Sequence, residues 1–324
     1  MKHWLLPENG TFYKANMHSH SNLSDGNLTV EKLKEEYVKQ GYSILAYTDH
    51  DKFYTHNDLT DENFLAINGY EVDISNWDTD DSHYVRCYHF NCYALTNKEN
   101  SEVLPLPPYK DKKAINRFIQ RLRDNGFIVC YNHPFWSLQT LDDYRDLEGL
   151  FGIEIFNYAS RINDGVTGNE TNVYDTMLRQ GKRLYCLAAD DNHNGNPIGH
   201  PRCDSFGGFI MVKAVSLDYD TIMQAIQNGD FYASAGPLIE ELTMENNVAT
   251  IKCSPVVRIA MTTGGRRGGS VNTLEGETMS CAEFAVDPKD TFIRFELIDE
   301  RGKQANSRAY FLDEFMTFKI EGAF

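Results

Sequence analysis

The sequence predicts an α/β protein in which a region of repeated strands and helices precedes a smaller all-β region. The 324 residues suffice for about two domains at ~150 residues each. Helix-like and strand-like stretches alternate over the first two thirds, whereas only short alternating runs follow Gly236-Pro237. At this length, a hydrophobic share of 41 % can form a sizeable core, which excludes global disorder.

The first helix–strand unit begins at Thr29, a residue typical of helix N-caps. Leu33 and Tyr37 are spaced to share one face of the helix that follows, and Gly41 occupies the place of a C′ glycine. The apolar run over residues 43–47 then indicates a buried strand.

Three more helix-like stripes follow, and a glycine ends each one. They are Ile115 to Leu122 with Gly126 and a strand over 127–131, Val173 to Leu178 with Gly181 and a strand over 184–188, and Ile222 to Ile226, capped by Ser216, with Gly229. Repeated units of this kind indicate a parallel sheet, closed or open.

The last part of the chain has no helical pattern. Residues 249–253, 256–261 and 292–297 are short alternating runs typical of strands, and glycine pairs at 264–265 and 268–269 separate them. We therefore predict a domain over residues 1–236 that carries the helices, and a small β-sandwich-like domain over residues 237–324.

Charge and composition exclude several classes of protein. The net charge of −16 argues against a binder of nucleic-acid backbones, which needs clustered Lys and Arg. The apolar run Trp4-Leu5-Leu6 is too short for a signal peptide, and no run approaches the ~18 residues of a membrane span. We therefore expect no membrane contact. The seven cysteines form no Cys-x-x-Cys pair, which is typical of a reduced, cytoplasmic protein.

Histidines and carboxylates gather where the strand-like runs end. His18 and His20 are two residues apart, so on an extended strand their imidazoles face the same side, and Asp191 and His193 repeat this spacing. The other candidate residues also lie in or close to strand-like runs. They are Asp25, His50, Glu71, His89 and His133.

Each candidate has an ordinary structural explanation when it is taken alone. His89 lies within an apolar strand and is typical of a hydrogen-bonded core histidine, while His133-Pro134 and Asp25-Gly26 are typical of turns. Their joint occurrence at successive strand ends favours a shared site, because α/β barrels build active sites there. Imidazole and carboxylate ligands together suit Zn, Mn, Fe or Ni.

The order of these motifs resembles the PHP (polymerase and histidinol phosphatase) superfamily over residues 10–235. The matching pieces are His-x-His, Ser-Asp-Gly, Thr-Asp-His, Gly-x-Glu, a single His, His-Pro and Asp-x-His, at His18 to Gly26, Thr48 to Asp51, Gly69 to Glu71, His89, His133-Pro134 and Asp191 to His193. The resemblance implies a distorted seven-stranded β/α barrel with two or three divalent ions, expected to be Mn, Fe or Zn.

The resemblance also implies three ligand sets: His18, His20, Glu71 and Asp191; Glu71, His89 and His133; Asp25, His50 and His193. Two positions have neighbours that compete for the role. Asp190 precedes Asp191, and His83 lies near His89 in a polar stretch. The family pattern and the two-residue spacing to His193 favour Asp191 over Asp190. His89 fits the family better than His83, because a hydrophobic run follows it.

The function implied is attack by a metal-bound hydroxide on the phosphate ester of a small molecule. Arg161 and Arg202 are candidate donors to the substrate phosphate and His200 a candidate proton donor, although each is equally typical of a solvated surface. Asp49 and Asp190 are candidates for orienting ligand histidines.

Two other functions stay open. The first is hydrolysis of a carboxylic ester, amide or carbamate, because residues 231–237 and 295–303 loosely resemble the carbamate-hydrolase-like branch of the superfamily. The second is a noncatalytic metal-dependent protein whose β domain recruits a partner. The sequence does not indicate an oligomeric state.

Overall fold

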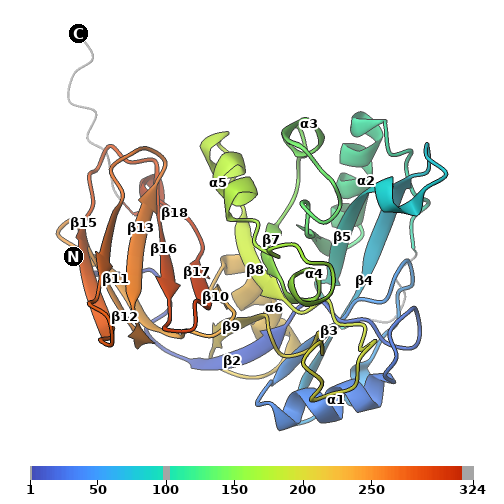
Figure 1. The fold of residues 1–324 in the computed structure, drawn as a ribbon, viewed down its shortest axis with the longest axis horizontal. Helices are drawn as coiled ribbons and strands as arrows, with labels where there is room; N and C mark the ends of the chain where they lie inside the picture. The colour runs from blue at the N-terminus through green and yellow to red at the C-terminus, as the bar shows by residue number, and fades with distance from the viewer. Residues whose placement is uncertain (1, 98–102, 316–324) are drawn as a thin grey trace. The chain divides into compact units, whose positions relative to one another are not determined.

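The computed structural model describes residues 2–97 and 103–315, which fold as two compact units (Figure 1). The α/β unit comprises Asn9–Ala235, and the β unit comprises Met1–Glu8 with Gly236–Phe324. The first eight residues differ from the sequence-based boundary, which groups them with the strand–helix region. They join the β unit because strand β1 (Lys2–Trp4) pairs with β11 (Ile239–Glu245).

A mixed sheet forms the centre of the α/β unit, and its hydrogen-bonded order is β10-β9-β2-β3-β4-β5-β6-β7-β8. Its strands are β2 (Thr11–Asn16), β3 (Ile44–Tyr47), β4 (Leu65–Asn76), β5 (Arg86–Ala94), β6 (Phe127–Tyr131), β7 (Gly152–Asn157), β8 (Tyr185–Ala189), β9 (Phe209–Ala214) and β10 (Phe231–Ser234). Strands β2, β3 and β4 are parallel, as are β6, β7 and β8.

The sheet departs from the expected seven-stranded barrel. Strand β5 is antiparallel to both of its neighbours, β4 and β6. Only residues 77–85 separate it from β4, too few for the helical crossover that a parallel pair needs. Strand β8 lies near β9 and β10, but no ladder joins them within the described residues, so the sheet does not close. The predicted α/β class is confirmed, and hydrogen-bonded closure is absent.

Six α-helices accompany this sheet in the described part of the unit. They are α1 (Val30–Lys39), α2 (Lys112–Asp124), α3 (Leu141–Tyr144), α4 (Tyr158–Asn163), α5 (Thr171–Arg179) and α6 (Tyr219–Asn228). Thr29 caps α1 as predicted, by accepting a hydrogen bond from the Lys32 N–H. The cap of α6 differs from the prediction, because Asp218 accepts from the Thr221 N–H while Ser216 donates to Asp218.

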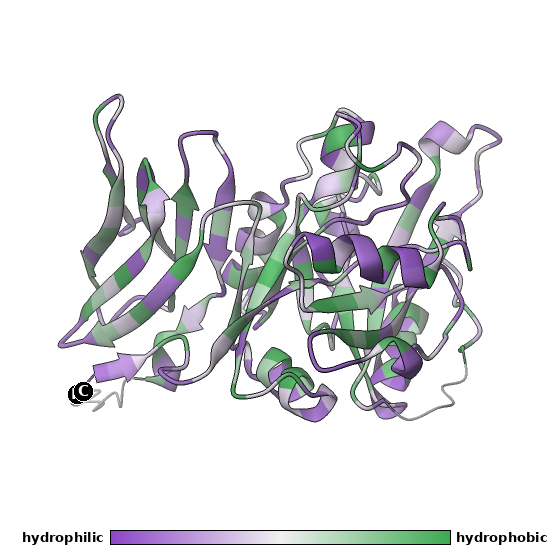
Figure 2. Cartoon of the chain, turned by 90° about the horizontal axis from the view of Figure 1, so that it is seen from below, coloured by the Kyte–Doolittle hydropathy of each residue, from purple (hydrophilic) through white to green (hydrophobic). Residues whose placement is uncertain are grey.

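The core of the α/β unit forms where helices cover the sheet. Helix α1 buries Leu33 and Tyr37 against Leu45 and Phe64. Hydrophobic colour is concentrated along the strands in Figure 2, whereas the helices carry both hydrophobic and hydrophilic residues. No helix in the described ranges combines the length and the hydrophobicity needed to cross a membrane.

The β unit contains two antiparallel sheets. One has the order β1-β11-β12-β15, with β12 (Val248–Val256) and β15 (Met279–Ala285). The other pairs β14 (Gly269–Asn272), β13 (Arg258–Thr263), β16 (Phe292–Ile298) and β17 (Gln304–Ser307), with β18 (Tyr310–Phe311) also on β16. The rings of Phe284 and Phe295, one from each sheet, lie 5.9 Å apart. Two sheets in contact agree with the β-rich pattern of this region.

Candidate metal centre

Nine side chains singled out by the sequence lie together in the α/β unit. Six follow directly after β2, β3, β6 and β8, two lie on β4 and β5, and one lies in the loop after β2. They are His18, His20, Asp25, His50, Glu71, His89, His133, Asp191 and His193. The strand ends bring them together because parallel strands finish at the same edge of a sheet.

The innermost group consists of His18, His20, Glu71 and Asp191, all buried. The Nε2 atoms of both histidines lie 3.1 Å from Asp191 Oδ1. They lie 3.2 and 3.3 Å from Glu71 Oε2. Four converging nitrogen and oxygen atoms match the donor number of a divalent metal site.

Glu71 connects this group to its neighbours. Its Oε1 lies 3.1 Å from His89 Nδ1 and 3.3 Å from His133 Nε2. Its Oε2 lies 3.3 Å from His50 Nδ1. Glu71 thus also forms a group with His50 and His89, and His133 forms another with His18 and Glu154. The expected set of Glu71, His89 and His133 is brought together at Glu71 Oε1, and His50 also approaches this carboxylate.

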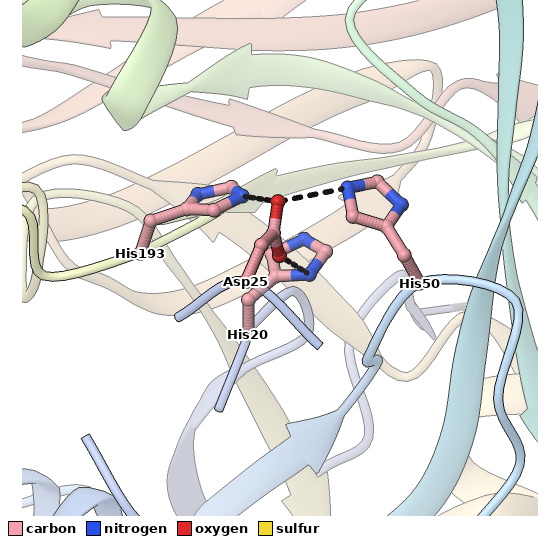
Figure 3. A group of neighbouring side chains, drawn as sticks. All are labelled: His20, Asp25, His50 and His193. Carbon is pink, nitrogen blue, oxygen red and sulfur yellow. Dashed lines mark ion pairs between the residues drawn. The ribbon is translucent and has the colours of Figure 1, made fainter. Parts of the chain in front are cut away.

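A third group lies closer to solvent, around the half-exposed carboxylate of Asp25 (Figure 3). Its oxygens lie 3.4 Å from His193 Nε2, 3.6 Å from His20 Nδ1 and 3.7 Å from His50 Nε2. The expected set of Asp25, His50 and His193 is thus brought together, and His20 joins it.

The donor atoms fit divalent cations. Buried His20 Nδ1, His50 Nδ1 and Asp191 Oδ1 have no hydrogen-bond partner within the described residues, and all three belong to the groups above. A buried polar atom without a partner is costly, and a bound cation would remove that cost. A mixture of imidazole and carboxylate suits Mn, Fe or Zn.

Opposite charges determine the pKa values in the centre. Burial would raise the pKa of Glu71, but the charges of His18, His89 and His50 hold it well below its ordinary value. Burial would lower the pKa of His193, but the hydrogen bond to Asp25 and the charge of Asp191 raise it to about 9. The pKa values of His18 and His89 are raised as well, by neighbouring carboxylates, whereas burial lowers the pKa of His50 to about 4. Protons on His18, His89 and His193 would thus balance the carboxylates, and metal ions would replace those protons on binding.

Two candidate ligands adopt a backbone conformation that non-glycine residues seldom use. His133 has a φ of 25° and Asp191 a φ of 55°. Such residues cost on the order of 1–3 kcal/mol each and cluster at functional sites. Asp191 N–H donates to the His18 carbonyl at 3.0 Å, which links the loops after β2 and β8.

Sequence reasoning missed Glu154, a fully buried acid on β7. Its Oε1 lies 2.6 Å from His18 Nδ1, and its Oε2 accepts from the His133 N–H at 3.3 Å. Asn157 Nδ2 donates to the same Oε2 at 3.0 Å. An ionisable residue inside the apolar run of residues 152–156 was the available signal.

Asp49 and Asp190 position loops rather than ligand histidines. Asp49 accepts from the backbone N–H and the hydroxyl of both Ser21 and Ser24, which shapes the loop that carries Asp25. Asp190 accepts from Tyr37 Oη at 2.6 Å and from three backbone N–H groups of residues 206–208. Within the described ranges, neither acid hydrogen-bonds a histidine of the cluster.

A cavity of about 440 Å³ opens over the centre, and its wall includes Trp136 and Asp164 besides all members of the cluster except His18 and His20. The proposed helpers Arg161 and Arg202 are exposed and do not line it. Exposed His200 lines a different cavity, of about 270 Å³. The competing His83 is exposed and pairs with Asp81, away from the cluster.

No protein-family model and no curated protein matches this sequence. Among solved structures, the chain is similar to a two-domain protein from Bacteroides vulgatus ATCC 8482 that contains a predicted PHP-like metal-dependent phosphoesterase. The identity is 16 % and the TM-score 0.49, over 95 % of this chain and 98 % of that chain.

Two further structures are similar over shorter stretches. A putative metal-dependent phosphoesterase from Bifidobacterium adolescentis ATCC 15703 shares 15 % identity at a TM-score of 0.38, over 60 % of this chain and 91 % of that chain. An amidohydrolase from Chromobacterium violaceum, with bound sulfate and no metal, shares 12 % identity at a TM-score of 0.39, over 67 % of this chain and 96 % of that chain.

Proposed function

We propose that this chain is a metal-dependent hydrolase of the PHP type, acting on a small phosphate ester. The observation that carries the proposal is the convergence of nine histidine and carboxylate side chains, seven of which line one cavity. The motif order described above supports the family, and the donor chemistry supports two or three Mn, Fe or Zn ions as cofactors. Divalent ions supply positive charge to a phosphoryl group and lower the pKa of a nearby water.

The residues of the chain divide into inner and outer roles in this proposal. Glu71 and Asp191, both buried, would hold two cations close together, because each presents its oxygens to several imidazoles. Glu154 would keep His18 Nδ1 occupied, so that Nε2 faces the centre. Asp25, His50 and His193 line the cavity together with Glu71, His89, His133 and Asp191, so these ligands would face a bound substrate.

Hydrolysis of a carboxylic ester, amide or carbamate is a second candidate. One observation favours it: within residues 2–97 and 103–315, no Lys or Arg lines the cavity. Phosphate sites commonly present a guanidinium or an ammonium group, so a neutral acyl substrate also fits this wall.

A substrate panel with added Mn²⁺ tests both candidates. We expect turnover of p-nitrophenyl phosphate, bis-p-nitrophenyl phosphate or a nucleotide in preference to p-nitrophenyl acetate and an aryl carbamate. The opposite preference would replace phosphate esters by acyl substrates as the substrate class.

His18→Ala and Asp191→Ala should each reduce hydrolysis to background, because each removes a buried donor atom of the inner group. His83→Ala, at an exposed position outside the cluster, is the matched control. Retained activity in either variant, or less than about one metal ion per wild-type chain after gentle purification, would contradict the proposed centre.

A further inference from the structure

The outer wall of the cavity differs in chemistry from the metal centre beneath it. Its lining residues beyond the cluster are mostly polar and uncharged or acidic: Trp136, Ala159, Ser160, Asn163, Asp164, Gly195, Asn196 and Asp204. This part of the wall lies where a substrate bound at the metals would place the rest of its structure.

Trp136 is fixed in this wall. Its indole Nε1–H donates to Asp164 Oδ2 at 3.0 Å, and its ring lies 5.1 Å from the ring of His133 and 5.7 Å from that of His89. The side chain nevertheless remains 39 % exposed. A held but accessible indole is a ready surface for the flat face of a ligand.

The charge of the wall is negative. Asp204 accepts from the backbone N–H groups of His193 and Asn194 at 3.1 and 3.0 Å, so it is committed to the loop after β8. The side chain of Asp164 hydrogen-bonds only Trp136 within the described part of the chain, through Oδ2, and its Oδ1 makes no hydrogen bond there. The guanidinium of Arg202 donates to the Asn163 carbonyl at 3.3 Å and does not line the cavity.

We propose that the leaving-group portion of the substrate has no anionic substituent and binds against Trp136 and Asp164. A second phosphate or a carboxylate there would face Asp164 without a lining Lys or Arg to offset the repulsion. A neutral or cationic group with a flat face would stack on the indole and could donate to Asp164. This inference rests on the proposed function only in so far as the site cleaves an ester bond.

The test uses full-length protein loaded with Mn²⁺ and three matched ligands: phenylphosphonate, 4-(aminomethyl)phenylphosphonate and 4-carboxyphenylphosphonate. Calorimetry should show the neutral and cationic ligands binding about fivefold or more tightly than the anionic one. Asp164→Asn should reduce the ratio of cationic-ligand to anionic-ligand affinity about fivefold and leave the affinity for the neutral ligand nearly unchanged. Asp220→Asn, at an exposed position of α6, is the matched control.

Trp136 is tested separately. Trp136→Ala should weaken all three ligands, whereas Trp136→Phe should retain most of the affinity because it keeps an aromatic face. The inference would be overturned if the anionic ligand bound as tightly as the neutral and cationic ligands. It would also be overturned if Asp164→Asn left the ratio of cationic to anionic affinity unchanged. A preference for the anionic ligand that disappears in Arg202→Gln would overturn it too and assign the wall to that guanidinium.

The same three substituents on phenyl phosphate and on phenyl acetate separate this inference from the proposed function. Turnover of the acetates alone would reject phosphate esters as substrates. The relative rates with the neutral, cationic and anionic substituents would still decide the inference. If the hydrolysed series shows the same rate for all three substituents, the inference is rejected. If neither series is hydrolysed, equal binding of the three phosphonates rejects it.

Discussion

Glu154 joins two candidate ligands from a single position on β7. One carboxylate oxygen lies 2.6 Å from His18 Nδ1, and the other accepts from the His133 N–H and from Asn157. Asn157 also donates to Asp191 at 3.1 Å. Because the acid is fully buried, its carboxylate interacts with these groups rather than with solvent, and it fixes the orientation of His18.

Glu154→Gln should lower metal affinity by about 10- to 100-fold, the range found for partners that orient metal-ligating histidines. The amide keeps the volume but removes the charge and one acceptor oxygen. Competition with a chelator measures the affinity, and exposed Glu148→Gln is the control. Unchanged affinity in Glu154→Gln would show that His18 is oriented without it.

At the scale of elements, the turn after β6 and helix α5 are tied together by Glu170. This residue occupies the N-cap position of α5, and its side chain makes no cap hydrogen bond. Its carboxylate instead accepts from the Phe135 N–H at 3.0 Å, which anchors the turn that carries His133 and Trp136. Burial raises the pKa of Glu170 to about 7.

The raised pKa predicts a pH-dependent stability. The folded protein holds the Glu170 proton more tightly than the unfolded chain, so this stabilisation is full below pH ~4.5 and is lost as pH rises through about 7. A glutamine at this position cannot ionise. The free energy of unfolding of Glu170→Gln, relative to wild type, should therefore be about 2 kcal/mol higher at pH 8 than at pH 5.

Denaturant unfolding at the two pH values measures this difference, and the same exchange at exposed Glu240 controls for the loss of one charge. A Glu170→Gln difference that is equal at pH 5 and pH 8 would contradict the assignment.

For the whole molecule, the division into units separates the proposed chemistry from the β unit. All nine candidate ligands fall between residues 18 and 193, within Asn9–Ala235. Residues 1–8 belong to the β unit through the pairing of β1 with β11. A fragment cut at the sequence-based boundary would therefore keep β1 without its partner strand.

We expect a fragment of residues 9–235 to bind the same number of metal ions as the full chain, because it keeps every candidate ligand. Metal analysis after purification checks this, with circular dichroism to show that the fragment is folded. A fragment of residues 1–236 is the comparison and should be less soluble, since β1 exposes an unpaired edge. A folded 9–235 fragment that loses its metal would place part of the centre's support in the β unit.

Local patterns in the sequence were enough for several features. Thr29 and the stripe of Leu33 and Tyr37 define α1, because capping and helical periodicity depend on residues a few positions apart. The motif order also identified the nine side chains that the structure brings together, since strand ends carry residues toward one edge of a sheet. Their roles as metal ligands stay a prediction.

Only the tertiary structure decided the pairings between distant segments. The antiparallel β5, the open sheet and the transfer of residues 1–8 to the β unit all depend on which strands meet, and single segments do not encode that choice. Glu154 beside His18 and Asp164 beside Trp136 are contacts across 136 and 28 residues of chain. Sequence by itself determined which chemical groups were available near the strand ends. Packing decided which of them are buried, paired and turned toward the cavity.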